Sequence, residues 1–239
     1  MADKIKTATI PNFITCLNLL SGCVGIVLAF GGNNVAAMIC LLLAAVFDFF
    51  DGFVARLLKS RSPVGVELDS LADMVSFGLL PAAMLFRFIS GSVLFLEAPA
   101  AVRYIVSYMP FVLTIFSALR LAKFNVDDRQ TTSFIGLPTP ANALFFSSLS
   151  LGLGSVNDLW LTLALIVVFS YLMVSEIPMF SLKIKNFSVK KYAFQLALAT
   201  LSGVAIAQSF FGGIPVLSAF APIILLYILL SVAKWLLKL

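Results

Sequence analysis

The sequence predicts an all-α polytopic membrane protein with about eight transmembrane helices, and three observations lead to this prediction. Apolar stretches of about 20 residues recur along the chain, the length that a helix needs to cross roughly 30 Å of hydrocarbon. Charged residues make up only 11% of the composition and hydrophobic residues 61%. Most of the apolar stretches also lack the polar face that a helix of a soluble protein presents to water.

The predicted helices are separated by clusters of residues that favour turns. These clusters contain glycine, proline, serine, asparagine and charged side chains. We expect helices at 12–30, 34–57, 67–90, 102–123, 137–154, 156–176, 192–211 and 215–235.

The distribution of positive charge predicts the orientation of this topology. An even number of spans places both termini on one side of the membrane. Of the 16 lysines and arginines, only Arg87 and Arg103 then fall on the opposite side. By the positive-inside rule, both termini and the loop at 56–66 are expected to be cytoplasmic. The net charge of +5 is explained by this topology and by attraction to anionic lipid headgroups, so no nucleic-acid partner is expected.

The composition also restricts the chemistry that the protein can perform. The sequence contains no histidine, which excludes Ser-His-Asp triads, phosphohistidine intermediates and zinc sites with histidine ligands. The three cysteines lie within apolar segments and are expected to pack as small apolar side chains. Carboxylates therefore remain as the principal candidates for a general base.

The end of the second predicted helix carries acidic and small residues on one face. At 100° per residue, one sector of the helix contains five such positions: Asp48, Asp51, Gly52, Ala55 and Arg56. Glycine and alanine leave room for a bulky ligand against the helix. An arginine beside them can bind a phosphate through two parallel hydrogen bonds.

The third predicted helix carries a matching set, because Gly65, Asp69, Asp73 and Ser76 share one face. A short break at 62–65 allows the two helices to run antiparallel, so that four carboxylates face one another near the membrane surface. Each aspartate within a bilayer costs about 2.5–3.5 kcal/mol, and the four charges repel one another. Hard divalent cations remove this conflict, and four aspartates could hold two of them around a phosphoryl group.

Two other interpretations of these acids remain open from the residues alone. The aspartates could simply pair with nearby lysines and arginines at the membrane surface. A cation-coupled transporter also places acids within the membrane. However, a transport path needs polar groups at the membrane midplane, whereas these acids gather at one face and alternate with small residues. An enzyme is therefore favoured.

The run from Asp48 to Asp73 reads D-x2-D-G-x2-A-R-x8-G-x3-D-x3-D. This pattern closely resembles the signature of the CDP-alcohol phosphotransferase family. Further stretches resemble the membrane-embedded phosphatidylserine synthase branch of that family: IPNFITCLNLLSG, LDSLADMVSFG, ALRLAKFN and FIGLPTPANA. The resemblance implies a six-helix catalytic core, which we place at 10–175 of a single membrane domain, 1–239. A basic connector and two additional transmembrane helices, 176–239, are expected to follow the core.

The resemblance also implies a reaction and the residues that perform it. The phosphatidyl group of CDP-diacylglycerol would pass directly to L-serine, giving phosphatidylserine and CMP. Asp73 would be the general base on the serine hydroxyl. The implied ligands of two divalent ions, Mg²⁺ or Mn²⁺, are Asp48, Asp51, Asp69 and Asp73. The implied CDP-binding residues are Asp51, Gly52, Ala55, Arg56, Gly65 and Asp69.

The acceptor site is expected near Arg120 and Lys123, which lie at i and i+3 on the fourth predicted helix. These cations could bind the serine carboxylate or the diphosphate. The same chemistry with glycerol 3-phosphate, inositol phosphate or choline is the alternative, but the LDSLADM and GLPTPA stretches favour serine. Because family members are commonly dimers, a homodimer is expected. Its active site would face the cytoplasm from the cell membrane.

Overall fold

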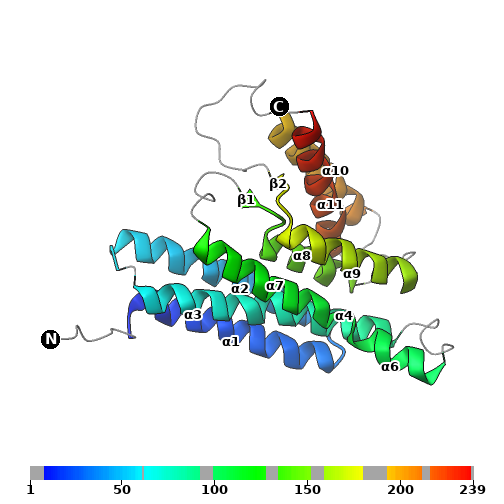
Figure 1. Cartoon of the computed structure of the whole chain (residues 1–239), viewed down its shortest axis with the longest axis horizontal. Coiled ribbons are helices and arrows are strands. Elements are labelled where there is room, and N and C mark those ends of the chain that lie inside the picture. Colours follow the sequence, from blue (N-terminus) through cyan, green and yellow to red (C-terminus); the bar gives the residue numbers. More distant parts are fainter. Residues whose placement is uncertain are drawn as a thin grey trace.

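A computed structural model describes residues 8–60, 62–91, 99–127, 134–151, 159–179, 193–211 and 216–237. Within these ranges the fold is helical except for two short strands (Figure 1). The elements are α1 (Ile10–Phe30), α2 (Asn34–Leu57), α3 (Pro63–Asp73), the π-helix η1 (Met74–Leu79), α4 (Leu80–Ser90), α6 (Ala100–Tyr108), α7 (Phe111–Val126), β1 (Phe134–Ile135), α8 (Thr139–Leu149), α9 (Leu159–Val174), β2 (Pro178–Met179), α10 (Ala193–Phe211), the 3₁₀-helix η2 (Val216–Ala219) and α11 (Phe220–Leu236).

The architecture confirms the predicted fold class, an all-α polytopic membrane protein. Among the described residues, five helical stretches are long and apolar enough to cross a bilayer: Ile10–Phe30, Asn34–Leu57, Pro63–Ser90, Ala100–Val126 and Val216–Leu236. The fifth and sixth predicted segments contain the shorter helices α8 and α9. The join between them and the basic connector lie outside the described residues. The number of spans and the division into a core and a C-terminal extension remain predictions.

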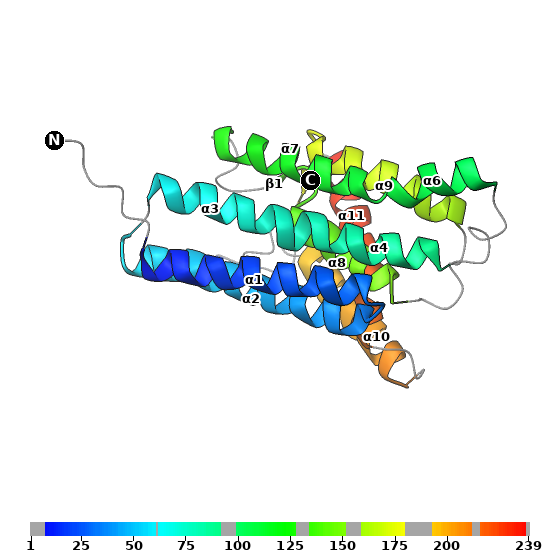
Figure 2. The ribbon, with the colours of Figure 1, turned by 90° about the horizontal axis from the view of Figure 1, so that it is seen from below.

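The long helices form a bundle in which α3, η1 and α4 make one continuous rod. Figure 2 shows this rod lying between the α1–α2 pair and α7. Contacts of the rod with α1 on one side and with α7 on the other agree with that view. The helices α10 and α11 form a pair that crosses the long helices steeply (Figure 1). The centre of the α3–α4 rod therefore has α1 on one side and α7 on the other.

The starts of the first three helices follow from local sequence. The Thr9 and Asn33 side chains accept hydrogen bonds from the first turns of α1 and α2. The Ser62 Oγ accepts one from the Gly65 amide at 3.0 Å, and Pro63 occupies the first turn of α3. Such caps pair amides that have no partner within the helix, and proline in the first turn loses no helical hydrogen bond. The Ser-Pro sequence thus fixes where α3 begins beside the end of α2.

The buried and exposed faces of α1 differ in the way expected for a helix that borders lipid. Its buried residues are small or polar: Pro11, Asn12, Thr15, Asn18, Gly22, Gly25 and Ala29. Its exposed residues include large apolar side chains, among them Phe13, Leu20, Val27 and Phe30. Small residues allow close approach of helices within a membrane, where apolar side chains can face the lipid.

A very close helix contact occurs where α1 crosses η1. A Cβ atom added at Gly22 would lie 2.4 Å from the Ser76 Oγ and 3.0 Å from the Ser76 Cα. On the other side of η1, a Cβ at Gly78 would lie 3.1 Å from the Ser117 Cβ of α7. Single π-helical turns within α-helices often occur at functional sites, and this one begins directly after Asp73.

The second half of the chain is held largely by apolar packing. Phe145 and Phe146 of α8 pack against Phe169 of α9, with ring centroids 4.2 and 5.2 Å away. The two strands pair antiparallel through two residues each, and Gly136 follows β1 with a φ of 77°. The sequence did not predict this ladder, because two residues are too few to show an alternating pattern.

Candidate active site

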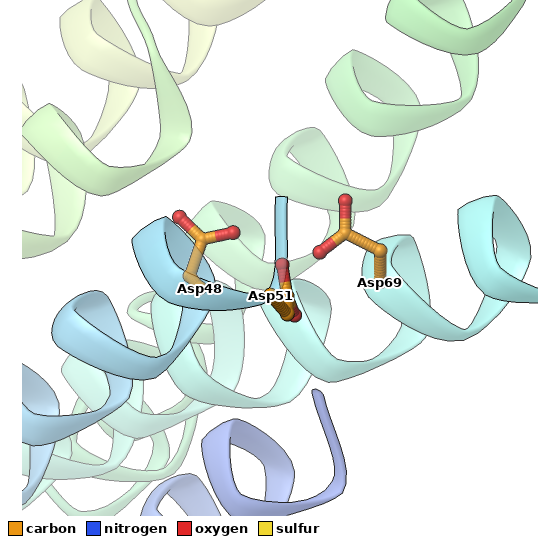
Figure 3. A group of neighbouring side chains, drawn as sticks. All are labelled: Asp48, Asp51 and Asp69. Atoms are coloured by element: carbon orange, nitrogen blue, oxygen red, sulfur yellow. The ribbon is translucent and has the colours of Figure 1, made fainter. Parts of the chain in front are cut away.

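Three of the four predicted acids form a close cluster. Asp48 and Asp51 extend from the last turns of α2, and Asp69 extends from α3 (Figure 3). One carboxylate oxygen from each residue lies within 4.8 Å of those of the other two. The chain reverses direction between the end of α2 and the start of α3, and both helices pack against α1, so the two acidic faces predicted from the helical spacing meet.

The cluster fits a divalent cation by both charge and donor type. Carboxylate oxygens of Asp48, Asp51 and Asp69 lie within 4.8 Å of one another, although ionised carboxylates repel. The Asp69 Oδ1 atom is buried and has no hydrogen-bond partner among the described residues. A buried acceptor without a donor is unfavourable, and oxygen-only ligand sets suit Mg²⁺, Mn²⁺ or Ca²⁺. A bound cation would satisfy this oxygen and remove the repulsion.

Asp73 lies one helical turn beyond Asp69, outside the close cluster but beside it. Its side chain is buried, and its Oδ1 accepts a hydrogen bond of 3.1 Å from the Asn18 Nδ2 of α1. Its charge interacts with those of Asp48 and Asp69. The structure therefore brings all four predicted aspartates to one site, with Asp73 in a different environment from the other three.

Helix α1 contributes polar residues that the sequence analysis did not assign to the site. The Thr15 Oγ1 donates a hydrogen bond of 2.6 Å to the Asp51 Oδ2. The Ser76 Oγ donates to the Asn18 carbonyl oxygen at 3.0 Å and so fixes the backbone beside Asp73. A signal was available, because Asn12, Thr15 and Asn18 repeat every three residues in an otherwise apolar helix. That spacing places all three on one face.

The remaining residues predicted to bind CDP surround the exposed side of the cluster. Gly52, Ala55 and Gly65 are half-buried, and Arg56 is exposed. A Cβ at Gly52 would lie 3.3 Å from the Arg56 Nη1, so this guanidinium already lies against the glycine. The charge of Arg56 also interacts with Asp51. Small residues and one mobile cation next to the acids leave space for a nucleotide diphosphate.

The two predicted acceptor-binding residues have different surroundings. The Arg120 side chain is buried, its Cζ lies 5.2 Å from the centroid of the Phe124 ring, and its charge interacts with that of Asp73. The Lys123 Nζ donates to the Val174 carbonyl oxygen at 3.2 Å and forms an ion pair with Glu176. Arg120 is therefore a buried cation of α7, whereas Lys123 joins α7 to the end of α9.

Comparison with known proteins agrees with the resemblance of the sequence. The CDP-alcohol phosphatidyltransferase family profile matches residues 8–172. An archaetidylserine synthase of Methanothermobacter thermautotrophicus is 36% identical over 182 residues, which cover 74% of this chain and 72% of that protein. A CDP-diacylglycerol–serine O-phosphatidyltransferase of Bacillus subtilis is 33% identical, over 70% of this chain and 88% of the relative.

Another relative extends the similarity over nearly the whole chain. A CDP-diacylglycerol–serine O-phosphatidyltransferase of Helicobacter pylori is 30% identical over 235 residues, which cover 95% of this chain and 90% of that protein. The matched family region contains all four aspartates and both helices that carry them. The chain is therefore a member of the CDP-alcohol phosphatidyltransferase family.

Proposed function

We propose that this protein transfers the phosphatidyl group of CDP-diacylglycerol to L-serine, giving phosphatidylserine and CMP. The observation that carries this proposal is the convergence of Asp48, Asp51 and Asp69, with Asp73 beside them. The names of the curated relatives support serine as the acceptor. Donor and acceptor would meet at the aspartate cluster.

The four aspartates would hold two divalent ions, Mg²⁺ or Mn²⁺. Asp48, Asp51 and Asp69 supply the close oxygen cluster, and Asp73 supplies a fourth carboxylate. When bound, such ions neutralise the diphosphate and stabilise charge on the leaving nucleotide. The hydrogen bond from Thr15 to Asp51 holds one ligand in a fixed orientation, as outer partners of metal ligands commonly do.

The nucleotide would lie against the surface formed by Gly52, Ala55 and Gly65. Gly65 also allows α3 to approach α1 closely, because a Cβ there would lie 3.1 Å from the Asn12 Oδ1. Arg56 is exposed and free to move toward a phosphate, which it can bind with two parallel hydrogen bonds. Asp51 and Asp69 would contact both the nucleotide and the metal ions.

Asp73 would act as the general base in a direct displacement. As the serine hydroxyl oxygen attacks the phosphorus of the phosphatidyl group, its proton passes to the Asp73 carboxylate. The bond from that phosphorus to CMP breaks, and CMP leaves with the electron pair. The Asn18 hydrogen bond to the Oδ1 of Asp73 leaves the other carboxylate oxygen to receive the proton, and proton transfer of this kind contributes about 10²–10⁴-fold.

Arg120 would bind the carboxylate of serine. It is the buried cation of α7, it interacts with Asp73, and a guanidinium matches a carboxylate in planar geometry. Lys123 would act less directly, because its ion pair with Glu176 joins α7 to the segment after α9. Replacement of Arg120 by alanine is expected to raise the KM for serine more than the KM for CDP-diacylglycerol.

We also propose the orientation and assembly of the protein. The protein would lie in the cell membrane, and the aspartate cluster would face the cytoplasm. Arg87, one of two cations expected on the outer side, lies near Gly32 of the α1–α2 turn, at the opposite end of the bundle. A homodimer would cover part of the apolar surface that the long helices expose.

The test is release of CMP by the purified protein in detergent with Mg²⁺ or Mn²⁺. Serine, glycerol 3-phosphate, inositol phosphate and choline are supplied one at a time with CDP-diacylglycerol, and CDP-archaeol replaces the donor in a parallel series. The proposal predicts that serine alone stimulates metal-dependent CMP release. Stimulation by a different alcohol would overturn the acceptor, and activity with CDP-archaeol alone would overturn the donor.

A further inference from the structure

Two side-chain hydrogen bonds join helix α7 to the rod formed by α3, η1 and α4. The Thr114 Oγ1 of α7 donates to the Gly78 carbonyl oxygen of η1 at 3.1 Å. The Asn125 Nδ2 of α7 donates to the Ser70 Oγ of α3 at 2.8 Å. Thr114 and Asn125 are 11 residues apart, about three helical turns, so they lie on one face of α7. Because the later donor pairs with the earlier acceptor, the two elements run antiparallel.

The packing around these two hydrogen bonds differs. At the first, α7 and η1 are in close contact, since a Cβ at Gly78 would lie 3.1 Å from the Ser117 Cβ. At the second, within the part of the chain that the structure describes, α3 is not among the main packing partners of α7, which are α9 and η1. The hydrogen bond between Asn125, which is exposed, and Ser70, which is half-buried, therefore joins two helices that do not pack closely there. Its loss would free the end of α7 to move relative to α3.

The predicted acceptor-binding cation and the predicted base lie between these two hydrogen bonds. Arg120, which is buried, lies in α7 between the two donors, and Asp73 lies in the rod between the two acceptors. At 1.5 Å per residue, Arg120 is about 7–8 Å along the helix from Asn125, and Asp73 is about 4–5 Å from Ser70. The two residues therefore lie at nearly the same level of the paired helices. The distance between their side chains then depends on how far apart the helices are held.

We propose that Asn125 and Ser70 are a positioning pair, whose hydrogen bond holds the end of α7 against α3 and matches the distance between Arg120 and Asp73 to the length of the acceptor. The skeleton of serine fixes the distance between its carboxylate and its hydroxyl group. A displacement of about 1 Å at a reacting group can lower the rate about 10²-fold. This inference rests on the proposed function, in which Arg120 binds the carboxylate and Asp73 receives the hydroxyl proton. It gives the pair no part in metal binding.

The test uses Ser70→Ala, Asn125→Ala and the double variant in the full-length protein. Each single change should lower kcat/KM for serine about 3–10-fold, the loss expected for one hydrogen bond. The KM for CDP-diacylglycerol and the Mn²⁺ concentration for half-maximal activity should stay near wild-type values. Because both changes remove the same bond, the double variant should lose no more than either single variant. Ser70→Thr keeps the hydroxyl group and should retain activity.

Acceptor length distinguishes positioning from a general loss of structure. Homoserine has the same carboxylate and hydroxyl groups as serine and is one methylene longer. When the end of α7 can move away from α3, the site should discriminate less between the two acceptors. Ser70→Ala is therefore expected to lower the ratio of kcat/KM for serine to that for homoserine. A purely structural role would lower both values equally and leave the ratio unchanged.

Asn34→Ala and Ser90→Ala are the matched controls. The Asn34 Nδ2 also joins two elements, because it donates to the Ser150 carbonyl oxygen at 3.3 Å. The Ser90 Oγ donates to the Phe86 carbonyl oxygen of its own helix at 2.8 Å. Neither control should change kcat/KM for serine or the ratio of the two acceptors.

Three outcomes would overturn the positioning role and leave the proposed function intact. They are an unchanged acceptor ratio in Ser70→Ala, additive losses in the double variant, and equal losses in the controls. Absence of serine-dependent CMP release by the wild-type protein would instead overturn the proposed function.

Discussion

The two halves of this molecule are held together by different kinds of contact. Around the aspartates, where α1, α2, α3 and η1 meet, hydrogen bonds join the elements: Thr15 bonds to Asp51, Asn18 to Asp73, and Ser76 to the Asn18 carbonyl. Around α8 and α9, the core is built from stacked phenylalanine rings and aliphatic side chains. Where the protein is proposed to bind charged reactants, its own polar groups orient the carboxylates. Around α8 and α9, aromatic rings pack against one another.

This difference predicts which property each substitution changes. In the α1–α3 region, removal of one hydrogen bond displaces a carboxylate and should lower activity. In the α8–α9 region, removal of apolar volume should lower stability while activity per folded molecule is retained. The four predictions below test this contrast from the largest expected effect to the smallest.

Asp73→Asn should lower turnover by about 10³-fold or more, because the amide cannot accept the proton of the acceptor hydroxyl. Binding of CDP-diacylglycerol should remain detectable, since three of the four acids are unchanged. The measurement is single-turnover CMP release together with binding of the nucleotide lipid. Glu67→Gln is the matched control, because Glu67 is an exposed acid of the same helix. Near-normal turnover of Asp73→Asn would remove Asp73 from the role of base.

Thr15→Val should lower kcat about 10-fold with little change in folding, because it keeps the side-chain shape and removes the donor to Asp51. The lost hydrogen bond to a charged group corresponds to about 1.5–3 kcal/mol. A higher Mn²⁺ concentration for half-maximal activity should accompany the loss, as Asp51 is less well oriented. Thr162→Val of α9 is the control, a buried threonine in the other half. Equal losses in the two variants would refute the contrast between the halves.

Gly22→Ala should lower activity several-fold and destabilise the protein by about 1–3 kcal/mol, the usual range for overpacking. The added methyl group would overlap Ser76 and separate α1 from η1. Gly203→Ala is the control, because a Cβ there meets no atom within 4 Å and alanine favours a helix. Activity and thermal unfolding in detergent are the measurements. A fully active Gly22→Ala protein would show that close approach of α1 to η1 is dispensable.

Phe169→Leu should leave kcat and both KM values close to wild type, because the ring makes apolar contacts with Phe145 and Phe146 of α8. Loss of the aromatic contacts should lower the midpoint of thermal unfolding, by an amount that corresponds to about 1–3 kcal/mol. A large change in the serine KM without loss of stability would show that the apolar half also shapes the site.

The sequence predicted the location of the acids well and their environment only partly. Asp48 and Asp51, three residues apart, share a face of one helix, and Asp69 and Asp73, four residues apart, share a face of the next, so the turn between the helices was expected to bring the two faces together. The contribution of α1 was missed, although Asn12, Thr15 and Asn18 repeat along one face, because that repeat does not identify the side chains that they contact.

Helix positions were likewise predictable where hydropathy and turn residues act locally. The start of α3 is an exception: the helix was predicted from residue 67, but it begins at Pro63, because Ser62 caps it and proline fits its first turn. The π-helix after Asp73 and the β1–β2 ladder were not predictable. The π-helix lies where the chain contacts α1 and α7. The ladder pairs two segments that lie far apart in the sequence. Both features therefore depend on tertiary contacts.

The most direct test of the account is to locate Mn²⁺ by its anomalous scattering in crystals of the protein grown with CDP-diacylglycerol. The account predicts Mn²⁺ bound between α2 and α3, coordinated by Asp48, Asp51 and Asp69, with Asp73 within reach. The same experiment on Asp69→Asn should show reduced or absent occupancy. Manganese bound at a different place, or equal occupancy in Asp69→Asn, would contradict the claim that this cluster is the catalytic metal site.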